Sequence, residues 1–291
     1  PLSALSPEAE ENLGLPQPVL SVDESLLEEN VEVRRIIAAE STRLFTALFA
    51  AINDRVCSLA PLAKSAAIQA YVRELPDMTH DLCRMFYRCS TYSVLKNLEA
   101  YKPMILKQKW DVRSAKKREA EYMEVIEQDM KGAWDMMNTA SEEGRFTPLC
   151  VSRFWRVLMG CVLEELLSSF TEVKKCSQEG REQMGMDTNA IYNYATSLCD
   201  IQPADDAKDL KYVMDYLTCC KLEQPADVLA WAEKHKDDYS LEVVNSILNY
   251  AMAKKLNKQD LKDLKESIDR LYAEEEPEEE AEQPEEAEQE A

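Results

Sequence analysis

The feature that most constrains this chain is a set of apolar residues that recur every three or four positions: Val151, Trp155, Leu158, Val162, Leu166 and Phe170. That spacing places the side chains on one face of an α-helix, whereas a half-buried strand would alternate every second residue. Pro148 suits a first helical turn, and Gly180 alone is a weak breaker. We therefore predict one helix over residues 148–184 that forms the core of the fold.

The same period recurs through most of the sequence, and no strand-like alternation of useful length interrupts it. Prolines are taken as helix boundaries, because a proline inside a helix removes a hydrogen bond. The expected long helices are 23–60, 77–101, 111–143 and 148–184, with another between Pro61 and Pro76, and Gly144 ends the third of them. Shorter helices should begin near 187, 205, 225, 240 and 257, where Asp, Pro, Ser or Asn can start or cap a helix. These patterns predict an all-α fold: an antiparallel bundle of long helices followed by a stack of short helices.

The charge divides the chain into three parts. Residues 273–291 contain eleven Glu and no basic residue, and residues 1–30 contain seven acidic residues and no basic one. Only three of the 21 net negative charges therefore belong to the residues between. We expect an irregular lead-in over 1–22, a helical domain over 23–272 whose N-terminal helices occupy 23–103, and a disordered Glu-rich tail over 273–291. A near-neutral body without a basic stripe makes nucleic acid an unexpected partner.

The nine cysteines indicate where the protein works. Their number is odd and several lie among apolar helical residues, which favours a reducing, intracellular compartment. No window of about 18 apolar residues could span a membrane, and no secretory signal is visible. The chain begins with Pro1 instead of Met, from which we expect a fragment of a longer protein.

Motifs for catalysis or cofactor binding are missing from the sequence. The two histidines, His80 and His235, belong to no zinc-type pair, no Cys-x-x-Cys occurs, and the six glycines never form a phosphate-binding loop. Both histidines are interpreted as capped or partly buried structural rings. We predict a protein that is not an enzyme and has no catalytic residues, no metal, no cofactor and no small-molecule substrate.

Two basic segments are candidate interaction sites. The first carries a local charge of +6 and contains Lys102, Lys107, Lys109, Arg113, Lys116, Lys117 and Arg118. Such a segment is usually a solvated helix face, but it could also meet anionic lipid, an acidic partner or the Glu-rich tail of this chain. We expect weak peripheral membrane contact at most.

The second segment follows the apolar stripe and contains Lys174, Lys175 and Arg181, which form a candidate interaction surface. In a continuous helix, Cys176 and Gly180 would share a face, and their small size would let another helix approach closely. A structural role for this segment is therefore as plausible as a docking role.

This second segment also carries a family resemblance. Val173 to Arg181, followed by Met184 and Asp187, resembles the VKKCSxEGRxxMxxD segment near the C-terminus of syndetin-type subunits of the endosome-associated recycling complex. A related segment ends the corresponding subunit of the Golgi-associated retrograde complex. The similarity covers about 105–270, and its further matching segments are Lys109–Val112, Pro148–Leu149 and Trp231, His235, Tyr239 and Ser240.

The resemblance implies a helical domain of a vesicle-tethering complex that acts in endosomal recycling or retrograde transport. Its partners would be other subunits of that complex, and its location cytoplasmic, at endosome or Golgi membranes. The alternative is a structural subunit that reuses the same helical domain in a large stable assembly of the cytoskeleton or cilium, such as an axoneme. The long Glu-rich tail favours this alternative.

Overall fold

The computed structural model describes residues 31–59, 66–95, 98–116, 120–199 and 208–273. Within these ranges the regular elements are ten α-helices and one 3₁₀ turn, joined by a single isolated β-bridge. The all-α prediction is therefore confirmed. The chain divides into two compact units, residues 1–93 and 94–291, which are described separately.

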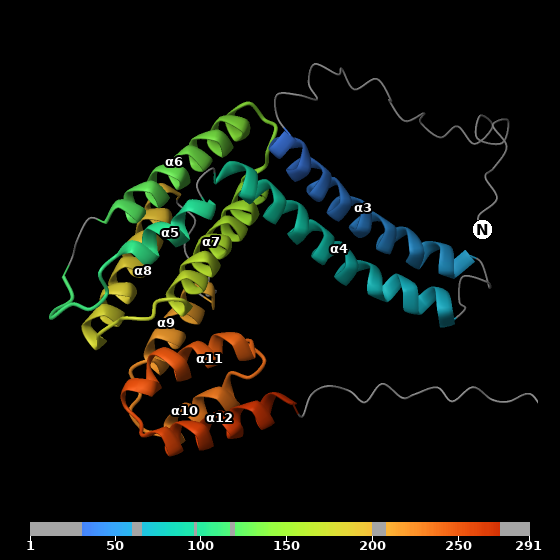
Figure 1. Cartoon of the computed structure of the whole chain (residues 1–291). Coiled ribbons are helices and arrows are strands. Elements are labelled where there is room, and N and C mark those ends of the chain that lie inside the picture. Colours follow the sequence, from blue (N-terminus) through green and yellow to red (C-terminus); the bar gives the residue numbers. More distant parts are fainter. Residues whose placement is uncertain (1–30, 60–65, 96–97, 117–119, 200–207, 274–291) are drawn as a thin grey trace, which may run out of the picture. The chain divides into compact units, whose positions relative to one another are not determined.

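The first unit is a pair of antiparallel helices, α3 (Val31–Leu59) and α4 (Ala66–Val94), which lie side by side in Figure 1. Hydrogen bonds join them at Arg35–Ser93, Ala39–Cys83 and Thr46–Thr79. Ile36 and Tyr87 are buried between these bonded positions. The helix expected over 23–60 is thus present from Val31, and its first eight residues lie outside the described ranges.

Two prolines contradict the helix boundaries that we predicted. Pro76 lies inside α4, so the expected helices before and after it are one continuous helix. Pro103 lies inside α5 (Leu98–Lys107), so that helix continues past the expected stop at residue 101. Both prolines are exposed, and water can therefore replace the hydrogen bond that each proline removes from its helix.

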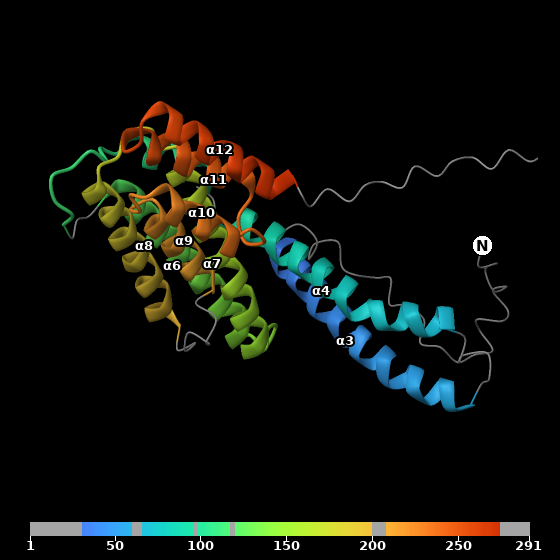
Figure 2. The same cartoon turned by 90° about the horizontal axis from the view of Figure 1, so that it is seen from below.

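The second unit is built around α7 (Pro148–Thr171). Helix α7 contacts α5, α6 (Glu121–Glu142), α8 (Gln178–Leu198), α9 (Lys208–Cys219) and α11 (Leu241–Tyr250). Figures 1 and 2 both show it within this group of helices. The remaining elements are α10 (Pro225–Lys234), the 3₁₀ turn η2 (Met252–Lys254) and α12 (Lys258–Ala273), and α12 packs against α10 and α11.

Helix α7 is the core of this unit, as its apolar stripe predicts. Leu158, Val162 and Leu166 have no solvent exposure, and Trp155 is buried against the edge of Trp134 on α6 at a ring distance of 5.3 Å. Burial extends beyond the stripe to residues such as Phe154 and Leu163, because other helices cover α7 on several faces. The short C-terminal helices were predicted correctly from Leu241 and Lys258 onward, with Ser240 and Asn257 at their caps.

The helix termini in this unit agree with some of the predicted boundaries and differ from others. Gly144 ends α6 with φ +73°, the left-handed conformation that glycine adopts easily, and the Gly144 and Arg145 amides bond to the Ser141 and Ala140 carbonyls at 2.9 Å. Thr147 caps α7 directly before Pro148. The predicted ends at residues 111 and 184 were wrong, because α6 begins at Glu121 and a non-helical link over 172–177 separates α7 from α8.

The lead-in over 1–22 and the Glu-rich residues 274–291 lie outside the described ranges. Within those ranges, no helix combines the length and the apolar character needed to cross a lipid bilayer.

Candidate functional site

Two of the segments that carry the family resemblance contact each other. The loop after α5 contains Lys109–Val112, and the link between α7 and α8 contains Val173–Ser177. Trp110 and Cys176 form a parallel β-bridge, and the Ser177 amide donates to the Trp110 carbonyl at 3.1 Å. The link therefore fastens this loop to the start of α8, and residues 109–112 do not open a helix as we predicted.

Ser177 is the centre of this contact. Its hydroxyl oxygen caps α8 by accepting from the Gly180 amide at 3.0 Å, and it also accepts from the Val112 amide at 3.1 Å. The same hydroxyl lies 2.8 Å from the Val112 carbonyl, to which it can donate its proton. One serine side chain thus ends the link, starts a helix and holds a distant loop, which explains why the helix expected through this position is broken.

Gly180 allows the loop to approach α8 closely. A Cβ atom built on Gly180 would lie 1.8 Å from the Trp110 carbonyl oxygen and 2.9 Å from the Cys176 sulfur. No side chain fits at such distances. The sequence indicated a close approach at Gly180 and Cys176, but the neighbour is the backbone of a loop and not another helix.

A chain of polar groups continues the contact along α8. The Lys116 amide donates to the Gln183 side chain at 2.7 Å, and the Gln183 amide group donates to Asp187 at 2.6 Å. The Tyr122 hydroxyl donates to the other Asp187 oxygen, also at 2.6 Å. Asp187 was predicted to cap a separate helix, but it is buried inside α8, where two donors compensate for its desolvation.

The side chain of Trp110 is buried beneath the loop to which it belongs. It is 2% exposed, its indole N–H donates to the Ile105 carbonyl at 2.9 Å, and its ring meets the edge of Phe170 at 5.8 Å. This buried ring gives the match at Lys109–Val112 a structural explanation that the sequence did not reveal.

The candidate interaction surface is not continuous. Lys174 and Lys175 are exposed on the link, whereas Arg181 is only 6% exposed and lies in the first turns of α8. The structure brings Arg181 close to a different group of basic residues, which is described below.

The first basic segment is spread over a helix end and a loop. Lys107, Lys109, Arg113 and Lys116 are exposed, whereas Lys102 is half-buried and forms an ion pair with Glu172, whose hydrogen bond raises the pKa of Lys102. Lys117 and Arg118 lie outside the described residues. The described part of this segment is therefore mostly an exposed loop, and not the helix face that the sequence suggested.

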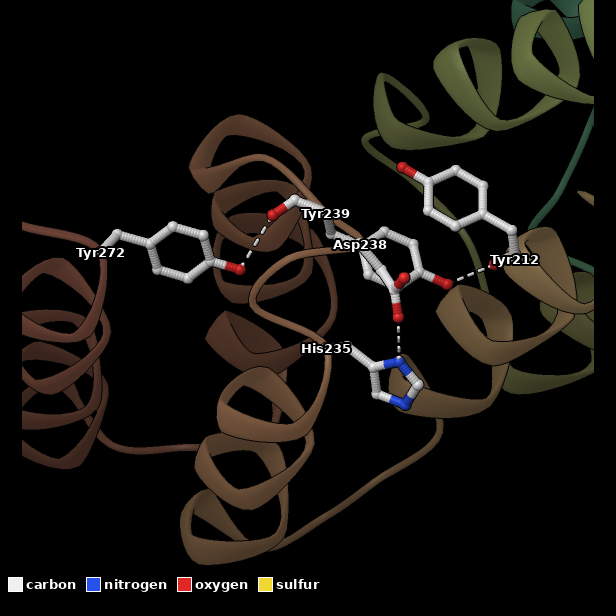
Figure 3. Close-up of polar contacts among 5 residues, drawn as sticks. All are labelled: Tyr212, His235, Asp238, Tyr239 and Tyr272. Atoms are coloured by element: carbon white, nitrogen blue, oxygen red, sulfur yellow. Dashed lines mark hydrogen bonds and ion pairs between the residues drawn. The ribbon is translucent and has the colours of Figure 1, made fainter. Parts of the chain in front are cut away.

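The matching residues near the C-terminus form an aromatic cluster. Tyr239 stacks on Tyr212 with ring centres 4.2 Å apart, and Trp231 packs on Tyr239 at 4.9 Å. Figure 3 shows the Tyr239 hydroxyl directed to the Tyr212 carbonyl and the Tyr272 hydroxyl bonded to the Tyr239 carbonyl at 3.0 Å. Burial raises the pKa of both Tyr239 and Tyr212. The cluster joins α9, α10 and α12 through the segment before α11.

His235 belongs to this cluster and has a structural position, as predicted. Its ring packs on Trp231 and lies 3.0 Å from an Asp238 oxygen, an approach drawn in Figure 3. His80, in contrast, is exposed on α4, so its predicted burial was wrong. Among the described residues, no group of three or more His, Cys, Asp or Glu side chains could hold a metal ion.

The buried cysteines are poorly suited to nucleophilic chemistry. Burial raises the pKa of the Cys176 thiol to about 11, and it also raises the pKa of Cys219 and Cys220. These thiols are therefore protonated at neutral pH, and only a thiolate is a strong nucleophile.

Comparisons with known proteins cover the residues of both sites described above. The family model described as "Syndetin, C-terminal" matches residues 33–269. Syndetin from Gallus gallus is 25% identical over 239 residues, and Syndetin from Mus musculus is 23% identical over 241 residues. Each alignment covers 81% of this chain and 24% of the relative, so the chain spans about a quarter of the length of these relatives. No solved structure matches. Since the family model covers well over half of the sequence, this chain belongs to the Syndetin C-terminal family.

Proposed function

We propose that this chain is a non-enzymatic protein-interaction domain of a vesicle-tethering subunit that acts in endosomal recycling or retrograde transport. Family membership supports the tethering role, because the family resemblance implies a subunit of such a complex. The observation that carries the interaction role is the set of large apolar side chains that α3 and α4 expose to solvent.

These apolar side chains form one stripe on each helix. On α3 the exposed residues Leu44, Leu48 and Ile52 follow one another four positions apart. On α4 the exposed residues Met78, Met85 and Tyr92 are seven positions apart, and Leu82 lies between the first two. Each of these side chains except Leu82 is more than half exposed.

The spacing indicates the kind of partner that fits. A seven-residue repeat of apolar side chains is the pattern onto which another α-helix packs in a coiled coil. Several large apolar side chains exposed in this way are typical of an interaction site in a protein that folds in water. The partner is therefore an amphipathic helix of another subunit of the complex.

The proposal can be tested by co-purification with the other subunits of the complex. The double variant Leu48→Glu, Met85→Glu should lose association, because each carboxylate would be desolvated at the interface. His80→Glu is the matched control: it places a carboxylate on the same helix away from the stripe and should retain association. The melting temperatures of all the variants should equal that of the wild type within about 2 °C, since surface substitutions change stability little.

Two outcomes would contradict the proposal. If the wild-type chain does not associate with any subunit of these tethering complexes, the tethering role is wrong. Co-sedimentation with axonemal or cytoskeletal polymers would instead support the alternative structural role. If association survives the double variant, the tethering role stands but the stripes are not the binding surface.

The exposed basic loop supports a second, weaker contact with anionic membranes. Lys107, Lys109 and Lys116 are exposed within ten residues, and each lysine near an anionic surface contributes about 1 kcal/mol. Retention on acidic liposomes should fall as salt rises, and reversing these lysines together with Lys117 to Glu should abolish it. Retention that is insensitive to both changes would exclude this electrostatic contact.

A further inference from the structure

A pocket opens in the second unit where three chain segments meet: the start of α8, the end of α9 and the η2 turn. Its volume is about 190 Å³. The polar and charged residues that line it are Ser177, Gln178, Arg181, Lys221, Tyr250, Lys254 and Lys255. Among the described residues, no Asp or Glu contributes to the lining, so four basic side chains share one pocket without an acid in its wall.

Arg181 is the residue that makes this arrangement unusual. Only 6% of it is exposed, yet within the described part of the chain its guanidinium has neither a hydrogen-bond acceptor nor an ion-pair partner. A guanidinium carries five N–H donors, and burying an ion without a partner is strongly unfavourable. The side chain instead faces the pocket, where a bound group could accept from it.

Lys254, the last residue of η2, and Lys255, which follows it, differ in the donors that remain available. Lys255 is within hydrogen-bond distance of the carbonyls of Cys220, Lys221 and Leu222, which use all three of its N–H groups. Lys254 donates to the Cys176 carbonyl at 3.2 Å and retains two N–H groups. Lys254 and Arg181 are therefore two of the cations in the lining that can donate to a ligand.

The local field of this pocket is positive. Burial, and then the nearby Arg181 charge, lower the pKa of Lys255, which shows that these two cations lie within electrostatic reach of each other. Two carboxylates act on the group from outside the lining: Glu223 on Lys255, and Asp111 on Cys176.

The start of α8 adds donors on the same side of the pocket. Ser177 caps the helix, and Gln178, its first residue, lines the pocket. The amides of the first helical residues have no acceptor within the helix, and the helix dipole places partial positive charge at this end. Helix starts combined with arginine are a common way in which proteins hold phosphate.

We infer that this pocket binds the phosphate group of a phosphorylated ligand, with Arg181 and Lys254 donating to its oxygens. A phosphate has three free oxygens and up to two negative charges, which matches several donors and several cations better than a single carboxylate does. This inference is independent of the proposed protein-interaction function, because it concerns a different surface in the other unit.

The test measures the melting temperature of the full chain in sodium phosphate and in sodium chloride of equal ionic strength. All four tryptophans of the sequence, Trp110, Trp134, Trp155 and Trp231, lie in the second unit, so their fluorescence reports its unfolding. At ten times its Kd, phosphate should raise the melting temperature by about 3 to 6 °C relative to chloride.

Variants identify the pocket as the cause of this shift. Arg181→Met keeps an unbranched apolar stem but removes the guanidinium and its charge, and it should abolish the shift. Lys254→Ala changes an exposed lysine, should fold normally, and should reduce the shift at a given phosphate concentration. The matched control, Lys174→Ala with Lys175→Ala, removes two exposed charges outside the pocket and should keep the full shift.

Vesicles separate the two sources of a phosphate group. Greater retention on vesicles containing phosphatidylinositol 4-phosphate than on phosphatidylserine vesicles of equal charge, abolished by Arg181→Met, would assign a lipid headgroup. Equal retention on both, with the phosphate shift intact, would assign a soluble phosphorylated compound. The inference is overturned if phosphate and chloride give the same melting temperature, or if the shift survives both Arg181→Met and Lys254→Ala.

Discussion

Gly180→Ala adds a single methyl group where the loop after α5 meets α8. The new Cβ would lie 1.8 Å from the Trp110 carbonyl oxygen, whereas contacts below 3.0 Å are essentially never found, so that oxygen must move by about 1.2 Å. The movement separates this carbonyl from the Ser177 amide, which donates to it at 3.1 Å in the wild type.

The expected cost follows from these contacts. The lost amide hydrogen bond contributes about 1 kcal/mol, and overpacking adds about 1 to 3 kcal/mol. Alanine offsets about 1 kcal/mol of this loss through its higher helix propensity. The variant should therefore lose about 1 to 3 kcal/mol of unfolding free energy, which lowers the melting temperature of a unit of this size by about 2 to 12 °C.

Tryptophan fluorescence during thermal unfolding measures this loss, and Gly132→Ala provides the matched control. Gly132 is an exposed position on α6 with no atom within 4 Å of a built Cβ, so the same substitution should leave stability unchanged or raise it by about 1 kcal/mol. The reasoning is refuted if Gly180→Ala melts at or above the wild-type temperature. Gly180→Leu should melt lower still.

Three further substitutions or conditions test other parts of the second unit. Leu158→Ala should cost about 2 to 5 kcal/mol of unfolding free energy, and an unchanged denaturant midpoint would contradict its place in the core. Tyr239→Phe removes the hydroxyl that bonds to the Tyr212 carbonyl but keeps the ring stack, so the loss should be about 1 kcal/mol, whereas no loss would show that this bond adds nothing. Because burial raises the pKa of Cys176 to about 11, peptide mapping after iodoacetamide treatment at pH 8 should find the exposed Cys89 modified first and Cys176 modification rising towards pH 11; rapid modification of Cys176 at pH 8 would contradict its burial.

The helical periodicity was sufficient to predict the core but not the breaks between helices. The stripe from Val151 to Phe170 correctly identifies the buried face of α7, because apolar residues at helical spacing mark the face that packs in the core. The break after Thr171 depends on Ser177, whose capping role is decided by its contacts with Val112 and not by its neighbours in sequence. Pro76 fails as a boundary because it is exposed, so water can replace the hydrogen bond that it removes from the helix.

The candidate sites show the same limit. Lys174, Lys175 and Arg181 are close in sequence, and a pattern can show no more than that. Their separation into two exposed residues and one buried residue depends on where the link ends and α8 begins. The lysines that share the pocket with Arg181 are 40 to 74 residues away in sequence, so the only signal in the sequence was its place in the matching segment. Asp187 was misassigned because its donor Tyr122 is 65 residues away.

The contact between Trp110 and Ser177 also sets an order of events during synthesis. The loop that contains Trp110 leaves the ribosome 67 residues before Ser177, so its indole has no cover from the segment that later holds it. A chain grows at about 5 to 20 residues per second, and apolar groups are therefore exposed for about 3 to 13 seconds at this stage. A nascent chain that stops before Gly180 contains the loop but not the start of α8 that binds it. During this interval a chaperone could cover the exposed Trp110 ring.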